Sequence, residues 1–302
     1  MHHETDNNQL TSTHWDCVHL FNISRLQENM AILKKITYTS LVICPILQPG
    51  FRFKTIDNFK YAIKSIISKK TPTLTPLSKI KNFLFSADGF VFLSASERDA
   101  FLEKFNEING KAYCIFENGI NPITPPTSST RIIDFICVGR VEPKKRTIET
   151  IDLISATTPG ALLMCVGALN WYHPVYCLKF LFRIALGKTA YMGRVQQSRA
   201  HDLMKTSKTL INLSELEVSP LVDLEALACG CNVISTNYSY AHLAESSNYK
   251  RIDVKDTHAC KEAISTPFSP TALNLASPNL WIENSKNYTK MVSQIIKNKK
   301  SP

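Results

Sequence analysis

The chain alternates short apolar runs with amphipathic stretches along almost its whole length. The apolar runs are short, rich in Val, Ile, Leu and Phe, and bounded by turn-forming residues, as is typical of buried strands. Such an alternation predicts βαβ units whose parallel strands are covered by helices on both faces. The predicted strands are residues 16–21, 39–44, 89–93 and 113–116 in the first part of the chain, and 134–138, 162–166, 189–192, 209–212 and 232–235 in the second.

Turn formers separate these two sets of strands. Residues 122–130 read Pro-Ile-Thr-Pro-Pro-Thr-Ser-Ser-Thr, a composition that sustains neither a helix nor a central strand. The pattern predicts an α/β protein of two Rossmann-like parallel-sheet domains, residues 1–125 and 131–280. Residues 281–302 are predicted to form a C-terminal helix, docked on a domain through its apolar face, and a tail.

One helical stretch carries an ambiguous pattern. The apolar segment 175–186 is interrupted by Lys179 and Arg183, which lie one helical turn apart. This spacing predicts a helix with a single solvated stripe, and we favour a helix that faces the core over one that lies on a membrane surface.

Composition adds few constraints. A chain of 302 residues with 44% hydrophobic residues has the material for two packed cores. No run reaches the roughly 18 apolar residues of a membrane-spanning helix, and the polar start lacks the apolar centre of a signal peptide. We therefore expect a cytoplasmic protein, with peripheral contact at the inner membrane surface as an open alternative.

Cysteines and charge do not indicate a metal or nucleic acid. The nine cysteines are scattered among apolar residues, as expected of small buried side chains in a reducing compartment. Cys229 and Cys231 lack the spacing of zinc ligands and a second pair, so no metal is expected. The net charge of +10 comes from lysines without interleaved aromatic residues, which favours a solvated face or attraction to an anionic membrane over nucleic-acid binding.

The segment 214–234 carries the most specific chemistry. It reads as a strand exit, a loop, a helix and a new strand, with Ser219 as the helix cap, Pro220 at the first helical position and Gly230 as the stop. The free N–H groups of such a helix start, at the carboxyl edge of a parallel sheet, are suited to a diphosphate. Glu217 in the loop and Glu225 in the helix supply two carboxylates, which suit the hydroxyls of a sugar and a ribose.

Cations follow a second strand. Residues 135–146 run from an apolar strand into a turn that holds Arg140 and Lys145. A guanidinium and an ammonium can stabilise the negative charge of a leaving diphosphate. A solvated basic turn is the alternative, but both segments end strands at the same predicted edge of the sheet, which favours a shared site.

These motifs resemble the retaining GT-B glycosyltransferases of the large group-one (family four) class. The resemblance lies in the two glutamates Glu217 and Glu225, which are separated by seven residues and followed by Ala-Leu-Ala-Cys-Gly-Cys, and in the run Gly-Arg-Val-Glu-Pro-Lys-Lys at 139–145. Residues 117–121, Glu-Asn-Gly-Ile-Asn, are similar to the family's interdomain Pro-Asn-Gly-Val/Ile-Asp. The likeness extends over roughly residues 85–297.

The resemblance implies a UDP- or GDP-sugar donor and no metal or other cofactor. It implies a role for each candidate residue, as follows: Arg140 and Lys145 on the diphosphate, Ser219 and the backbone of Leu221 and Val222 at the phosphate, Glu225 on the ribose, Glu217 as the catalytic residue on the sugar, and Arg194 and Val195 at the base. These last two belong to Tyr-Met-Gly-Arg-Val, which is similar to the family's Phe-Leu-Gly-Tyr-Val.

The first part of the chain departs from the family. Nothing in it resembles the opening strand and glycine-rich loop, so we expect a shortened first domain, and Phe21 stands where many relatives place a histidine. The leading hypothesis is transfer of a sugar, with retention, to a hydroxyl of a glycan or lipid-linked acceptor in surface polysaccharide biosynthesis. The alternatives are a truncated, non-catalytic paralogue that binds nucleotide sugar or a partner transferase, and a different GT-B activity such as epimerisation or phosphorolysis.

Overall fold

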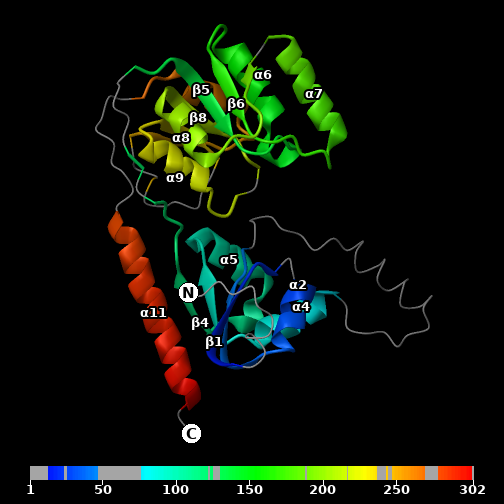
Figure 1. The fold of residues 1–302 in the computed structure, drawn as a ribbon, viewed down its shortest axis with the longest axis vertical. Coiled ribbons are helices and arrows are strands. Elements are labelled where there is room, and N and C mark those ends of the chain that lie inside the picture. Colours follow the sequence, from blue (N-terminus) through cyan, green and yellow to red (C-terminus); the bar gives the residue numbers. More distant parts are fainter. Residues whose placement is uncertain are drawn as a thin grey trace, which may run out of the picture. The chain divides into compact units, whose positions relative to one another are not determined.

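The chain folds into two compact units. The computed structural model describes residues 13–23, 26–46, 76–121, 123–124, 130–187, 189–215, 217–236, 243, 247–268 and 278–300. One unit comprises Met1–Glu117 and Trp281–Pro302, and the other comprises Asn118–Leu280 (Figure 1). The boundary thus follows Glu117, a few residues before the expected linker at 122–130, which lies mostly outside the described residues.

Unit 1 is built on a parallel sheet with the strand order β1-β2-β3-β4. Its elements before the boundary are β1 (His14–Phe21), α2 (Leu26–Leu33), β2 (Thr37–Cys44), α4 (Pro76–Phe85), β3 (Gly89–Phe92), α5 (Ala95–Lys104) and β4 (Ala112–Ile115). The start of α5 follows local chemistry, because the Ser94 hydroxyl accepts a hydrogen bond from the Glu97 N–H at 3.0 Å.

Both faces of this sheet are covered. Along β2, Leu41 and Ile43 belong to one core and Val42 and Cys44 to another, as the alternation of side chains across a strand requires. The first core is completed by α4 and α5, whereas the second includes Met291 and Ile295 of the C-terminal helix.

This C-terminal helix, α11 (Pro278–Lys300), is therefore part of unit 1. Two lysines in its last turn form ion pairs with residues of the sheet region. Lys299 Nζ lies 2.9 Å from Asp88 Oδ1, and Lys300 Nζ lies 2.7 Å from Asp16 Oδ1. The Tyr288 hydroxyl lies 3.2 Å from Nδ1 of His19 on β1. Apolar packing and charge together hold the helix along the sheet.

Unit 2 is a larger parallel sheet with the strand order β10-β9-β8-β5-β6-β7. Its elements are β5 (Ile133–Val138), α6 (Thr147–Thr157), β6 (Leu163–Val166), α7 (Pro174–Ala185), β7 (Ala190–Tyr191), α8 (Gln197–Lys205), β8 (Ser207–Asn212), α9 (Leu221–Ala228), β9 (Asn232–Ser235), β10 (Tyr249–Arg251) and α10 (Thr257–Ser265). Figure 1 shows α6 and α7 on one side of this sheet and α8 and α9 on the other.

The predicted α/β fold with parallel sheets is confirmed. Every predicted strand is present within a few residues of its expected bounds, and all strand pairs within the two sheets are parallel. The pattern missed β10, because Tyr-Lys-Arg is short and polar. All nine cysteines are free, and each is buried or half-buried, as expected of small packed side chains.

Helix α7 faces the core as expected, but its solvated side is not only the stripe of Lys179 and Arg183. Cys177 and Phe180 are fully buried on its inner side, but Val175, Leu178 and Phe182 are more than 60% exposed. The helix therefore faces the core with one side and presents apolar residues to solvent with the other. Within the described ranges, no helix is both long and apolar enough to cross a membrane.

The docking of α11 can be tested with two isoleucines of the same helix. Ile295 is 6% exposed and Ile282 is 54% exposed. We expect Ile295→Ala to lower the free energy of unfolding by about 2 to 5 kcal/mol, because it opens a cavity between the helix and the sheet. Urea unfolding followed by circular dichroism measures the change. Ile282→Ala is the control and should stay within about 0.5 kcal/mol of wild type; equal losses in both variants would contradict the packing.

Candidate functional site

The candidate residues meet at the carboxyl edge of the second sheet. Three backbone hydrogen bonds join the loops that follow neighbouring strands: Glu215 N–H to Lys144 C=O at 2.8 Å, Asn170 N–H to Val141 C=O at 3.2 Å, and Gly167 N–H to Gly193 C=O at 2.8 Å. The loops after β5, β6, β7 and β8 therefore form one continuous rim. Ligands of doubly wound parallel sheets bind at such an edge.

Gly139 and Gly167 allow the loops after β5 and β6 to approach each other closely within this rim. Gly167 has φ +145°, and a Cβ atom there would lie 1.9 Å from the Gly139 carbonyl oxygen. No side chain fits in that space, so the loops after β5 and β6 approach each other only because glycine stands at this position.

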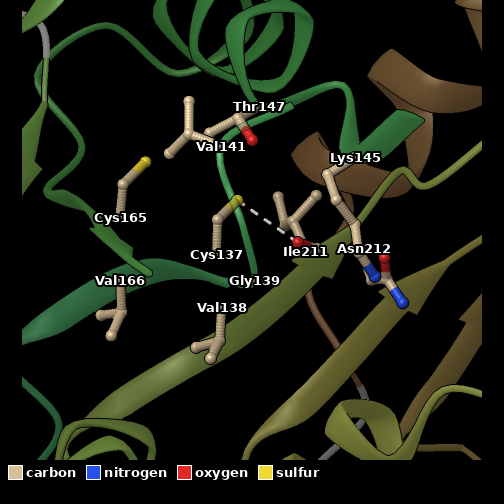
Figure 2. Close-up of a pocket in the computed structure, with 10 residues that line it drawn as sticks. All are labelled: Cys137, Val138, Gly139, Val141, Lys145, Thr147, Cys165, Val166, Ile211 and Asn212. Atoms are coloured by element: carbon tan, nitrogen blue, oxygen red, sulfur yellow. Dashed lines mark hydrogen bonds between the residues drawn. The ribbon is translucent and has the colours of Figure 1, made fainter. Parts of the chain in front are cut away.

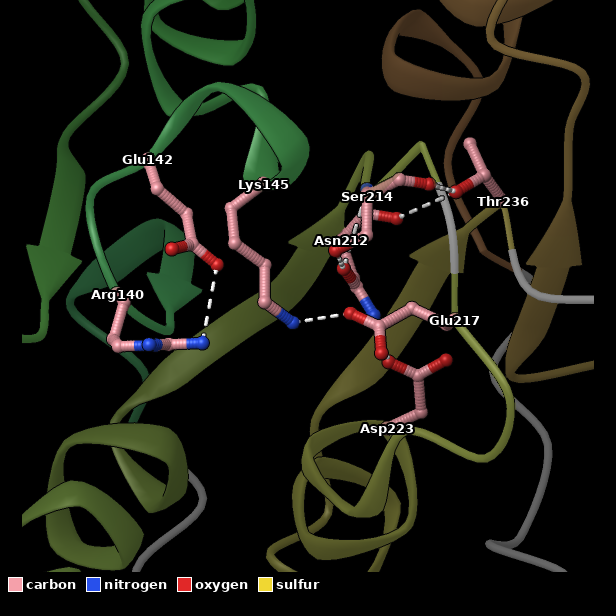
Figure 3. Close-up of polar contacts among 8 residues, drawn as sticks. All are labelled: Arg140, Glu142, Lys145, Asn212, Ser214, Glu217, Asp223 and Thr236. Carbon is pink, nitrogen blue, oxygen red and sulfur yellow. Dashed lines mark hydrogen bonds and ion pairs between the residues drawn. The ribbon is translucent and has the colours of Figure 1, made fainter. Parts of the chain in front are cut away.

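Lys145 and Glu217 form the central ion pair of the site (Figure 3). Lys145 ends the short turn Pro143–Lys145 after β5, and Glu217 lies in the loop between β8 and α9. Their side chains are 26% and 17% exposed, so the pair is partly shielded from water. The structure thus brings together two residues that lie 72 positions apart and were assigned to one site.

Arg140 is positioned by a separate acidic group. Its guanidinium lies 3.3 Å from the Glu142 carboxylate, which is only 8% exposed, while Arg140 itself is 67% exposed. The Asn170 amide donates to the other Glu142 oxygen at 2.5 Å. Glu142 therefore holds Arg140 at the rim while most of the Arg140 side chain stays exposed and accessible to an anion.

The start of α9 differs from the expected capping. The helix begins at Leu221 with Pro220 in the cap position, and no side chain caps it. Ser219 is therefore not the cap, and Pro220 is not the first helical residue. Leu221 and Val222 occupy the first turn, where backbone N–H groups have no carbonyl partner within the helix. Gly230 follows the helix with φ +78°, as expected of a helix stop.

Glu225 lies farther along α9 and has partners from α8. Its Oε1 accepts a hydrogen bond from the Gln197 amide at 2.6 Å and lies 3.6 Å from Nε2 of His201. The described contacts of Glu225 include neither Glu217 nor Lys145, so the two glutamates occupy separate places around the start of α9.

Arg194 and Val195 lie in the loop between β7 and α8. Arg194 is exposed, whereas Val195 is half-buried against the core shared by α8 and α9. The preceding Gly193 has φ +66° and accepts the bond from Gly167 that ties this loop to the rim. Both residues are thus placed next to the rim.

Sequence reasoning missed a buried carboxylate beneath Glu217. Asp223, the third residue of α9, is fully buried and accepts hydrogen bonds from the Asn212 amide at 2.8 Å and the Tyr249 hydroxyl at 3.1 Å. Burial raises the pKa of Asp223 to about 6, although hydrogen bonds from Ser235, Asn212 and Tyr249 act in the opposite direction. A polar residue at the end of β8, Asn212, could have indicated a polar cluster here. Nothing in the sequence indicated that Asp223 would be buried in it.

The same cluster supports the loop that carries Glu217. The Asn212 side-chain oxygen accepts from the Ser214 hydroxyl at 2.5 Å, and the Thr236 hydroxyl donates to the Ser214 carbonyl (Figure 3). A network of polar groups therefore fixes the chain between the end of β8 and the start of α9.

A small cavity lies just below the rim. Gly139, Lys145, Thr147 and Asn212 line it together with Val141 and apolar residues of β5, β6 and β8 (Figure 2). Its volume of about 20 Å³ is roughly that of one water molecule. A nucleotide cannot enter this cavity, so a ligand of that size would lie above it, on the rim itself.

Cations at strand ends, a helix start and two carboxylates define an anion- and polyol-binding edge. No cluster of three or more metal-ligating side chains occurs in the part of the chain that the structure describes. The arrangement suits a phosphorylated sugar compound held by protein groups.

Comparison with known families agrees with this class of site. Residues 127–268 match the family model of glycosyl transferases group 1, slightly less than half of the chain. The matched segment includes all nine candidate residues of the rim. No curated protein matches the chain.

Solved structures show the same fold at low identity. HepE from Anabaena, in complex with UDP and glucose, is 17% identical with a TM-score of 0.62, over 94% of this chain and 76% of that one. The lipopolysaccharide outer core galactosyltransferase WaaB is 18% identical with a TM-score of 0.62, over 94% and 78%. TarM is 10% identical with a TM-score of 0.59, over 94% and 51%, so this chain spans about half its length. The fold is therefore that of GT-B glycosyltransferases, with two Rossmann-like domains.

The buried carboxylate of Asp223 should make the free energy of unfolding depend on pH. A folded-state pKa of about 6 for Asp223 lies above the unfolded value near 3.9, so the folded chain binds more protons between these values. The contribution of Asp223 to the free energy of unfolding is therefore most favourable below pH 4 and is lost as the pH rises through 6. Relative to wild type, Asp223→Asn should gain about 3 kcal/mol in free energy of unfolding between pH 4 and pH 7.

Urea unfolding at a series of pH values measures this difference. Asp202→Asn is the matched control, because the Asp202 side chain on α8 is 58% exposed. Its curve should run parallel to that of wild type. If the Asp223→Asn curve were also parallel, Asp223 would not titrate as its burial requires.

Proposed function

We propose that the chain transfers a sugar from a nucleotide diphosphate sugar to a hydroxyl group, with retention of the anomeric configuration. The donor is a UDP- or GDP-sugar bound at the rim of the second sheet, and the acceptor is a glycan or a lipid-linked sugar. We further propose a role in the synthesis of surface polysaccharide.

The observation that carries the proposal is the meeting of Lys145, Glu217 and the start of α9 at one sheet edge. An ammonium beside unpaired helix N–H groups is suited to a diphosphate. The group 1 family match covers this edge, and HepE and the glycosyltransferase GtfA were solved with UDP. UDP is therefore the first nucleotide to test.

In the proposed complex, Arg140 and Lys145 contact the diphosphate, with the backbone of Leu221 and Val222 and with Ser219. Glu225 binds the ribose, and Arg194 and Val195 contact the base. A diphosphate that reaches Lys145 replaces Glu217 as its partner. The released Glu217 carboxylate then accepts hydrogen bonds from the sugar hydroxyls.

The reaction exchanges one bond at the anomeric carbon. The bond to the β-phosphate oxygen breaks, and a bond to the acceptor oxygen forms on the same face of the sugar. The departing diphosphate takes up the acceptor proton, so no separate base from the chain is needed. Arg140 and Lys145 stabilise the negative charge that develops on the leaving group.

Nucleotide binding is the first prediction of this proposal. Thermal unfolding of the full chain with UDP at a hundred times its dissociation constant should show an added stability of about 2.7 kcal/mol, because the ligand binds only the folded state. GDP and ADP are measured in parallel to identify the base. Absence of any shift with the three nucleotides and their sugar derivatives would contradict a donor site at the rim.

Three substitutions separate binding from transfer. Arg140→Ala and Glu225→Ala should each weaken nucleotide binding by about 1.5 to 3 kcal/mol, the usual contribution of a hydrogen bond to a charged group. Glu217→Ala should lower the transfer rate more than it lowers nucleotide affinity, because Glu217 contacts the sugar. Titration calorimetry measures affinity, and release of nucleotide in the presence of acceptor measures transfer.

Two charged residues away from the rim serve as controls. Lys208 pairs with Asp134 at the opposite edge of the sheet, and Glu262 on α10 is 70% exposed. Lys208→Ala and Glu262→Ala should bind nucleotide as wild type does. Wild-type affinity in folded Arg140→Ala and Glu225→Ala would show that the donor binds elsewhere. Donor binding without transfer to any acceptor would favour the binding-only paralogue.

A further inference from the structure

Helix α7 presents an unusual apolar surface to solvent. Its helical members are large side chains spaced three or four residues apart, so they lie on one side of the helix, and two aromatic residues of the preceding loop join them. We name this surface the α7 apolar stripe; it consists of Trp171 (58% exposed), Tyr172 (93%), Val175 (64%), Leu178 (61%), Phe182 (63%) and Leu186 (56%).

The stripe is not needed to hold α7 in the fold. The opposite side of the helix buries Cys177 and Phe180 completely, and Figure 1 shows α7 beside α6. Arg183 forms a two-pronged ion pair with Asp152 of α6 at 2.8 and 2.6 Å. Because this inner side is fully packed, the exposed residues of the stripe form a second, separate apolar face.

The segment that contains the stripe has no acidic residue, although α6 beside it carries Glu149 and Asp152. No Asp or Glu occurs between Asp152 and Asp202, and α7 itself carries the two basic residues Lys179 and Arg183, of which Arg183 is paired with Asp152. Lys179 is exposed and lies next to Leu178, one helical turn from Val175. An apolar side with Phe and Leu, flanked by basic residues, is typical of helices that lie in the headgroup region of a bilayer.

The aromatic residues at one end support the same environment. Trp171 and Tyr172 are exposed directly before α7, and such side chains favour the boundary between lipid and water. With 12 residues, α7 is about 18 Å long, shorter than the roughly 30 Å of a hydrocarbon core. A helix of this length lies along the surface.

We propose that the α7 apolar stripe docks the chain on a membrane surface that carries anionic lipids. The apolar side chains enter the boundary between headgroups and acyl chains, and Lys179 beside the stripe attracts the lipid phosphates.

Docking would also set the distance between the candidate site and the bilayer. The loop that carries Trp171 and Tyr172 also carries Asn170, whose amide donates to Glu142, the partner of Arg140. The stripe thus begins at the rim of the proposed donor site. For the acceptor, and only if the proposed function holds, this placement favours a sugar linked to a membrane lipid over a free glycan.

Vesicle binding of the full chain tests the docking surface. Co-sedimentation is measured with vesicles of phosphatidylcholine alone and with vesicles containing phosphatidylglycerol, at low and high salt. We expect binding to the anionic vesicles, weaker at high salt, and at least about tenfold weaker for the double variant Leu178→Glu, Phe182→Glu, because two buried apolar contacts are lost. Ile132→Glu, at another exposed apolar position of unit 2 (67% exposed), is the control and should bind as wild type does.

Tryptophan fluorescence locates the contact. Trp171 is one of three tryptophans, and its emission should shift to shorter wavelength and be quenched by brominated lipid when vesicles are added. Trp171→Phe should remove this signal while vesicle binding persists. Failure of wild type to bind anionic vesicles, or equal binding of the double variant, would overturn the proposal. So would a wild-type dimer that the double variant dissociates, because the stripe would then be a subunit interface.

The docking test is independent of the donor site. Nucleotide affinity of the Leu178→Glu, Phe182→Glu variant should equal that of wild type, since neither residue belongs to the rim. Vesicle binding without nucleotide binding would refute the proposed function alone, and nucleotide binding without vesicle binding would refute the docking alone.

Discussion

The hydrogen bond from the Glu215 N–H to the Lys144 carbonyl, 2.8 Å long, joins the loops on which the candidate site depends. These loops follow β5 and β8, which are neighbours in the sheet although other strands separate them along the chain. Parallel strands end at the same edge, so the bond requires no distortion of the sheet. With the two loops joined, Lys145 and Glu217 lie in contact and α9 begins beside them.

A second requirement is the rigid support below that contact. Asn212 donates to Asp223 and accepts from Ser214, so one amide connects the end of β8 with both the loop and the helix. Burying the carboxylate of Asp223 is unfavourable, as its raised pKa of about 6 indicates. Hydrogen bonds compensate part of this cost and restrict the loop to one conformation. The stability that Asp223 is expected to lose as the pH rises through 6 is therefore linked to the position of Glu217.

Most of the fold was predictable because it depends on local pattern. Apolar runs between turns marked the strands, and the rule that strand ends share an edge brought Lys145 and Glu217 to one site. Tertiary contacts decided the remainder. Asp223 occupies a position where most helices expose an acidic residue, and only its partners from β8 and β10 show that it is buried. Strand β10 itself, Tyr-Lys-Arg, has no apolar run and pairs only because β9 offers a free edge.

Helix α7 shows the limit of periodicity most clearly. Its sequence is apolar on two sides, and a single pattern cannot determine which side meets the core. The packing of Phe180 and Cys177 settles that question, and the ion pair between Arg183 and Asp152 fixes the orientation. The apolar side chains that remain in solvent add nothing to this packing, and their exposure is unfavourable unless another surface covers them. Because the loop at the start of α7 also holds Glu142 through Asn170, a surface that covers the stripe would lie next to the loop that positions Arg140.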